Sequence, residues 1–149
     1  MIAILAVSSA QSRLQPTPDL SPRAVVQTQL SALEHNDSPK PNTGIAVAFR
    51  FASPANQRAT GPLTKFIGIV RGEAYSPMIN HRRAEVGQPM VKGREATVPV
   101  LVDSADGKLV AYLFRLRRQE SEPYRNCWMT DGVELIGIKE PPQDGEIEL

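Results

Sequence analysis

The stretch EATVPVLVDSADGKLVAYLFRLR, residues 95–117, has the two-residue period of a strand on either side of an Asp-Gly pair. Every second side chain of a strand points to one face, and Asp106-Gly107 is a strong hairpin turn. Pro99 lacks an N–H, so its strand is expected to lie at a sheet edge or to carry a bulge. The predicted core face consists of Ala96, Val98, Val100, Val102, Val110, Tyr112, Phe114 and Leu116.

Further extended segments flank this hairpin. Residues 84–90 precede it across a Lys92-Gly93 turn, and a last strand is expected from Cys127 to about Leu135. Tyr75-Ser76-Pro77 is expected to begin the extended half of the chain. The second half therefore predicts an antiparallel meander.

The first half has the period of helices. Ser21-Pro22 is a helix-start signal, and the apolar stripe that follows ends before Asn36. Residues 44–52 are almost wholly apolar, which fits a buried helix or a strand. Their alanines favour a helix, which Ser53-Pro54 is expected to close.

A third helix is expected after Gly61-Pro62. Its apolar residues recur at helical spacing, and Gly72 follows in the place of a left-handed cap. The apolar residues of this helix are Leu63, Phe66, Ile67 and Val70. Helices followed by an antiparallel meander predict an α+β domain with the helices on one sheet face.

Length and composition exclude several classes of protein. The 149 residues suit one domain, and 17 basic against 16 acidic residues give no charge excess that would recruit nucleic acid or a membrane surface. A lone Cys127 can form neither an internal disulfide nor a four-ligand zinc site. We expect no metal, no cofactor, no nucleic-acid partner and no membrane span.

The two ends differ in composition from the body. Residues 1–21 predict a flexible leader or linker, with a short apolar run that loosely resembles a signal peptide and a proline-rich part after it. Residues 138–149 predict a disordered acidic tail. The domain itself is expected to cover residues 22–137.

Five short strings, taken in order, carry a family resemblance. They are Phe49–Pro54, Tyr75–Pro77, Arg82–Gly87, Val102–Gly107 and Trp128–Gly132. The chain resembles an uncharacterised domain-of-unknown-function family of bacteria, cyanobacteria and plant chloroplasts, which is similar to the nuclear transport factor 2-like (SnoaL-like, cystatin-like) superfamily. The resemblance covers about residues 22–136. The insertion at Glu120–Asn126 and the tail beyond Gly137 depart from the family pattern.

The resemblance implies a cone-shaped fold, in which a curved antiparallel sheet wraps around helices and leaves a pocket at its wide end. Superfamily enzymes such as ketosteroid isomerase use a carboxylate or histidine inside the cone for proton transfer. The family itself has no established catalytic residue to transfer.

The candidate site residues are therefore chosen for their chemistry. His81 and Asp131 are the candidate bases, although a loop histidine and a carboxylate at a strand end need no function. Tyr75, Arg82 and Tyr112 are candidate pocket residues. A tyrosine bonded to the backbone in the core is the alternative for Tyr112.

Basic side chains form a second candidate feature. They would lie in a stripe on the outer sheet face, either to bind an acidic partner or as a solvated face paired with Glu85 and Glu95. The residues of this basic stripe are Arg82, Arg83, Lys92, Arg94, Arg115, Arg117 and Arg118.

The sequence favours a non-enzymatic module that binds a small apolar ligand or a protein partner, with homodimerisation through the sheet face as one arrangement. The alternative is a cofactor-independent isomerase, dehydratase or cyclase with His81 or Asp131 as base. A soluble protein of the cytoplasm or the plastid stroma is expected, with an N-terminal signal as the other interpretation of the first residues.

Overall fold

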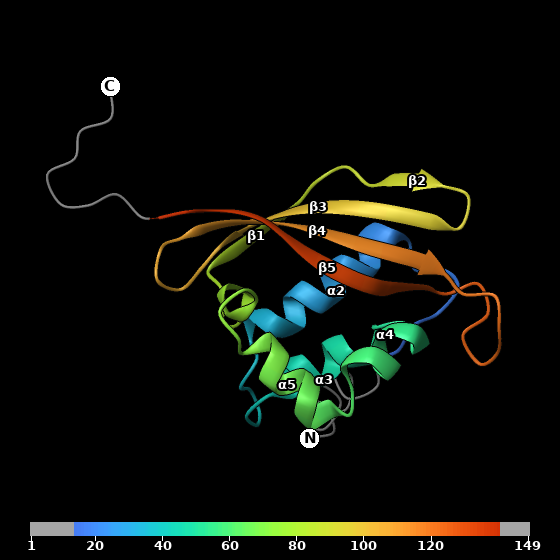
Figure 1. Cartoon of the computed structure of the whole chain (residues 1–149), viewed down its shortest axis with the longest axis horizontal. Coiled ribbons are helices and arrows are strands. Elements are labelled where there is room, and N and C mark those ends of the chain that lie inside the picture. The colour runs from blue at the N-terminus through green and yellow to red at the C-terminus, as the bar shows by residue number, and fades with distance from the viewer. Residues whose placement is uncertain (1–13, 141–149) are drawn as a thin grey trace, which may run out of the picture.

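The computed structural model describes residues 14–140 as one antiparallel sheet with helices packed on one of its faces (Figure 1). The predicted leader up to residue 13 and the predicted acidic tail from residue 141 lie outside the described residues. The helices are α2 (Pro22–Glu34), α3 (Thr43–Arg50), α4 (Pro54–Thr60), α5 (Leu63–Val70) and the short 3-10 helix η1 (Ser76–Met78). The strands are β1 (Arg83–Val86), β2 (Met90–Lys92), β3 (Glu95–Asp103), β4 (Leu109–Arg118) and β5 (Trp128–Lys139). This arrangement confirms the predicted α+β class.

The sheet is built on the β3–β4 hairpin. Its strand order is β1-β3-β4-β5, and β2 also pairs with β3. Val98 lies opposite Phe114 and Val100 opposite Tyr112, with all four side chains buried against the helices. β5 extends to Lys139, two residues past the predicted end of the domain. Two register shifts interrupt its pairing with β4.

Pro99 is in an inner strand, so of the two predicted arrangements, a sheet edge or a bulge, the sheet edge is wrong. β4 lies on one side of β3, and β1 and β2 share the other side. The gap between β1 and β2 falls opposite Pro99, where the Gly87 N–H donates to the Pro99 carbonyl at 2.8 Å. Pro99 has no N–H to return this bond. The guanidinium of Arg23 in α2 donates instead, to Val86 O at 2.9 Å and Gly87 O at 3.0 Å.

Helix α2 forms as its sequence predicts. The Ser21 hydroxyl caps it by accepting from the Ala24 N–H at 3.1 Å, and the helix ends at Glu34, before His35. Its apolar stripe is buried in the core. The preceding segment also contacts the body, because Arg50 Nη1 donates to Leu14 O at 2.8 Å.

The apolar segment after residue 44 ends earlier than predicted. Helix α3 stops at Arg50, and Ser53 then caps a separate helix, α4, by accepting from the Asn56 N–H at 3.1 Å. Ser-Pro starts a helix here because the hydroxyl can cap it and proline suits its first position. The connecting residues pair with the edge of β5: Thr130 N donates to Phe51 O, and Ser53 N donates to Thr130 O, each at 2.8 Å.

Two other local predictions are wrong. Gly72 is not left-handed, since the chain turns onward through backbone bonds from Tyr75 N and Ser76 N to the Gly72 carbonyl. Residues 76–78 form the 3-10 helix η1 rather than extended structure. This turn allows Tyr75 to face the sheet.

Polar side chains fix the connection between α2 and α3. The buried Asn36 accepts from Ile45 N at 2.8 Å, and Asp37 accepts from Asn42 N at 3.0 Å and from Arg71 at 3.2 Å. The backbone bond from Asn42 is the main cause that lowers the pKa of Asp37. At Gly44, the second residue of α3, the two helices are so close that an added Cβ would lie 2.1 Å from Ala32 O.

Candidate functional site

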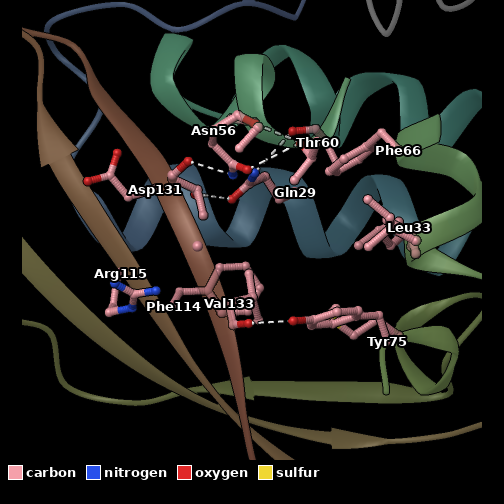
Figure 2. Close-up of a pocket in the computed structure, with 18 residues that line it drawn as sticks. Gln29, Leu33, Asn56, Thr60, Phe66, Tyr75, Phe114, Arg115, Asp131 and Val133 are labelled. Carbon is pink, nitrogen blue, oxygen red and sulfur yellow. Dashed lines mark hydrogen bonds between the residues drawn. The ribbon is translucent and has the colours of Figure 1, made fainter. Parts of the chain in front are cut away.

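A cavity of about 330 Å³ lies between the helices and the helix-facing side of β4 and β5 (Figure 2). The helices α2 to α5 all contribute lining residues, so the cavity sits where the helical layer meets the last two strands. Most of its wall is apolar. The apolar side chains of the wall include Leu33, Phe66, Ile69, Val70, Met78, Phe114 and Val133.

The polar end of the cavity is formed by two amides and two hydroxyls. Gln29 is buried in α2, where its Nε2 donates to Ala48 O at 3.1 Å and its Oε1 accepts from Thr130 Oγ1 at 2.7 Å. Asn56 Nδ2 donates to Thr130 O at 3.1 Å, and Thr60 Oγ1 donates to Asn56 O at 2.8 Å. An amide has two donor hydrogens and an oxygen with two lone pairs. The half-buried Asn56 therefore keeps bonding capacity toward the cavity.

Tyr75 and Tyr112 form one layer beside the cavity. Their rings stack with centroids 6.4 Å apart, and the hydroxyl of Tyr75 donates to Val133 O at 2.9 Å. Tyr75 lines the cavity, whereas Tyr112 lies buried and donates its hydroxyl to Ala74 O at 2.7 Å. Burial, and secondarily Tyr75, raises the pKa of Tyr112 above that of a free phenol. Tyr112 therefore has the environment of a core tyrosine.

His81 and Arg82 are placed away from the cavity lining. His81 is buried with Nδ1 2.7 Å from Met78 O, so that nitrogen carries the hydrogen, because a carbonyl can only accept. Arg82 is exposed and donates to Ala105 O at 2.8 Å. Neither residue is among those that line the cavity in residues 14–140.

Asp131 lies at the cavity, on β5. Its Oδ2 is 3.1 Å from Arg117 Nε, and Arg117 is also paired with Glu95 at 3.0 Å. Asp131, as hydrogen-bond acceptor and as charge, raises the pKa of Arg117, which stays a cation. Of the predicted site residues, the structure brings Tyr75 and Asp131 to this cavity.

Sequence reasoning missed the amides at the polar end. Gln29 interrupts the apolar stripe of α2 at a core position, which is a detectable signal because a buried polar side chain needs a partner. Asn56 and Thr60 were missed because helix α4 was not predicted. The Ser53-Pro54 pair was the signal for that helix.

The outer sheet face carries both apolar and charged side chains. A shallow groove of about 550 Å³ crosses it between Pro99, Leu101, Leu113 and Ile136. Several arginines of the predicted basic stripe are paired there, including Arg83 with Glu85. This pairing matches a salt-bridged face more closely than a free basic stripe.

No group of three potential ligands that could hold a metal occurs within residues 14–140. Cys127 is buried, and desolvation raises the pKa of its thiol, which disfavours the reactive thiolate. None of the described helices is both long enough and apolar enough to cross a membrane.

Comparison with known proteins shows the family of the chain. A family model described as a domain of unknown function (DUF4864) matches residues 17–142. No curated protein matches the chain. No solved structure matches it either.

Proposed function

We propose that the chain, which belongs to the family of the domain of unknown function DUF4864, is a non-enzymatic module that binds a small apolar ligand in its cavity. The observation that carries this proposal is a cavity of about 330 Å³ with apolar walls and one polar end. Ligand sites are typically mostly apolar pockets in which a few polar groups fix orientation.

The fold proposed for this module is the cone of the nuclear transport factor 2-like superfamily. Support comes from the register shifts of β5, at Ala111/Tyr112 and at Arg115/Leu116. An extra residue in one strand bends it and increases its twist. Such bends help a sheet to curve around the helices that it covers.

Binding is favoured over catalysis by the state of the two candidate bases. An acid–base residue must reach the substrate and hold a free site for the proton. His81 is outside the cavity lining, and Asp131 is engaged by Arg117. The isomerase, dehydratase or cyclase alternative would require Asp131 to leave this ion pair.

The proposal is tested by titration with phenylnaphthylamine, a neutral probe whose fluorescence rises in an apolar site. Val133 lines the cavity from β5, so Val133→Trp should fill it and abolish the rise. Leu113→Trp is the matched control, because it adds the same ring to the outer face of β4. Equal probe binding by both variants would place the probe elsewhere and end the proposal.

Self-association through the outer sheet face is a second candidate function. It is favoured by the apolar groove, where Leu101 and Ile136 are 39% and 58% exposed. Exposed apolar patches commonly mark interaction sites. Sedimentation velocity should show a dimer that Leu101→Glu dissociates, whereas a monomer at every concentration of the parent protein would exclude it.

A further inference from the structure

The side-chain amide of Asn56, which lines the cavity, is only partly used by the protein. Its Nδ2 donates to Thr130 O at 3.1 Å, and this bond fixes which end of the amide faces β5, because a carbonyl can only accept. The second hydrogen of Nδ2 has no partner among residues 14–140. The Oδ1 lies 3.3 Å from Thr60 Oγ1, but the single hydrogen of that hydroxyl is donated over the shorter distance of 2.8 Å to Asn56 O. Asn56 therefore offers a ligand one donor and one acceptor.

The neighbouring polar groups are bonded to one another or to the backbone. Gln29 is buried, and it bonds Ala48 O through Nε2 and the Thr130 hydroxyl through Oε1. Thr130 O accepts from Ser53 N as well as from Asn56, so both lone pairs of this carbonyl are used. At this end of the cavity, Asn56 is therefore the side chain with the most bonding capacity left for a ligand.

The charged side chains near the cavity carry no net charge. Arg117 is shared by Asp131 at 3.1 Å and Glu95 at 3.0 Å. Arg115 supplies the second positive charge, but it is exposed, and Figure 2 shows it across β5 from Asn56. A charged ligand would exchange its hydration for an apolar wall without an unbalanced opposite charge, which costs far more than the transfer of an uncharged polar group. The site therefore favours an uncharged ligand.

We infer that the cavity takes an uncharged ligand with an apolar body and one hydroxyl group, and that the side-chain amide of Asn56 binds the hydroxyl. This inference rests on the proposed ligand-binding function. A hydroxyl can use both the donor and the acceptor of the amide, whereas an ether or a ketone can only accept. The apolar body contacts Leu33, Phe66 and Val70, which line the cavity from α2 and α5.

The test is displacement of phenylnaphthylamine from the full chain at neutral pH by octanol, heptyl methyl ether, octanoate and octylammonium. Octanol and heptyl methyl ether are isomers, and the ether has no hydrogen to donate. Octanol should displace the probe at a concentration about three- to tenfold lower than the ether, as one net hydrogen bond predicts. An apolar wall alone would favour the ether, which is less strongly hydrated. Octanoate and octylammonium should both be weaker than octanol, because each must lose the hydration of its charge.

Variants assign the preference to Asn56. Asn56→Leu should abolish the preference for octanol over the ether, and Thr130 O keeps the Ser53 N–H as a donor in this variant. Gln57→Leu is the matched control, because it removes an amide of the same helix that donates to two backbone carbonyls and lies outside the cavity lining formed by residues 14–140. This control should keep the preference. Asn56→Ala, which adds no bulk, makes the same test if the leucine variant fails to fold.

The outcomes separate this inference from the function on which it rests. Equal displacement by octanol and the ether from the parent protein would overturn the hydroxyl preference and leave the binding function standing. Stronger displacement by octanoate or octylammonium than by octanol would overturn the uncharged ligand. A preference that persists without the Asn56 amide, or that disappears equally in Gln57→Leu, would overturn the role of Asn56. Absence of probe binding by the parent protein would refute the binding function itself.

Discussion

Gln29 provides the sharpest test of how the cavity is held together. Its buried amide connects α2 to α3 through Ala48 O and to β5 through Thr130 Oγ1. Gln29→Leu keeps a similar volume and removes both bonds. The carbonyl of Ala48 keeps a donor, the N–H of Phe51 at 3.1 Å, so the hydroxyl of Thr130 is the group that loses its partner.

The expected cost follows from that single hydroxyl. An unsatisfied buried polar group costs about 1–3 kcal/mol, so the free energy of unfolding should fall by about 2 kcal/mol in Gln29→Leu. Thr130→Val removes the same hydroxyl. The double variant Gln29→Leu with Thr130→Val should therefore recover about 1 kcal/mol relative to Gln29→Leu alone, since no orphaned group remains.

Urea unfolding followed by circular dichroism measures these differences. The slope of the transition should be unchanged in all variants, because the surface exposed on unfolding is nearly the same. A Gln29→Leu protein as stable as the parent would refute the reasoning. So would a double variant whose loss equals the sum of the two single losses, because the two side chains would then act independently.

The remaining predictions concern the frame around the cavity. Arg23→Met should lower the free energy of unfolding by about 1–3 kcal/mol, because the carbonyls of Val86 and Gly87 lose a charged donor; chemical denaturation measures this, and no loss would contradict it. Gly44→Ala should prevent stable folding, because its Cβ would lie 2.1 Å from Ala32 O. Gly68→Ala places its Cβ in open space and should stabilise α5 by about 0.5–1 kcal/mol. Thermal melting compares the two variants, and similar melting temperatures would refute the close contact at Gly44. The pKa of Asp37 is lowered in the folded protein, so its contribution to stability is present above its unfolded pKa of about 3.9 and is lost as pH falls through the folded value. Asp37→Asn should remove this loss of stability at acid pH from a series of denaturation curves. An unchanged pH dependence would contradict the prediction.

The sheet was the most predictable part of the fold. The alternation of Val98, Val100, Tyr112 and Phe114 specifies which face of the hairpin is buried, because a slip of one residue would expose all of them. The helix start at Ser21 was equally clear from its cap. These features depend on neighbours in the sequence, which sequence reasoning sees directly.

The wrong predictions depend on partners far along the chain. Pro99 can lie in an inner strand because Arg23, which is distant in sequence, donates to the carbonyls of Val86 and Gly87 where Pro99 has no N–H to offer. The segment after Arg50 leaves its helix because Phe51 and Ser53 bond to Thr130 of β5. Local propensity cannot reveal such bonds.

The candidate site was only partly predictable for the same reason. Tyr75 and Asp131 were found because their residue types suit a pocket, and both line the cavity. His81 was selected on its chemistry, which says nothing of the direction of its ring. Gln29 and Asn56 meet at Thr130 only through tertiary packing, so their joint role could not be read from spacing.

The bonds along the outer edge of β5 also bear on aggregation. An exposed strand edge is a template for pairing with another chain. Phe51 and Ser53 occupy that edge at Thr130, and the hydroxyl of Tyr75 occupies it at Val133. From Glu134 to Lys139 the strand is paired only with β4 among the described residues, and Ile136 and Ile138 are exposed there. On this side of the sheet, a tendency to form intermolecular sheets is therefore expected in the last six residues of the final strand.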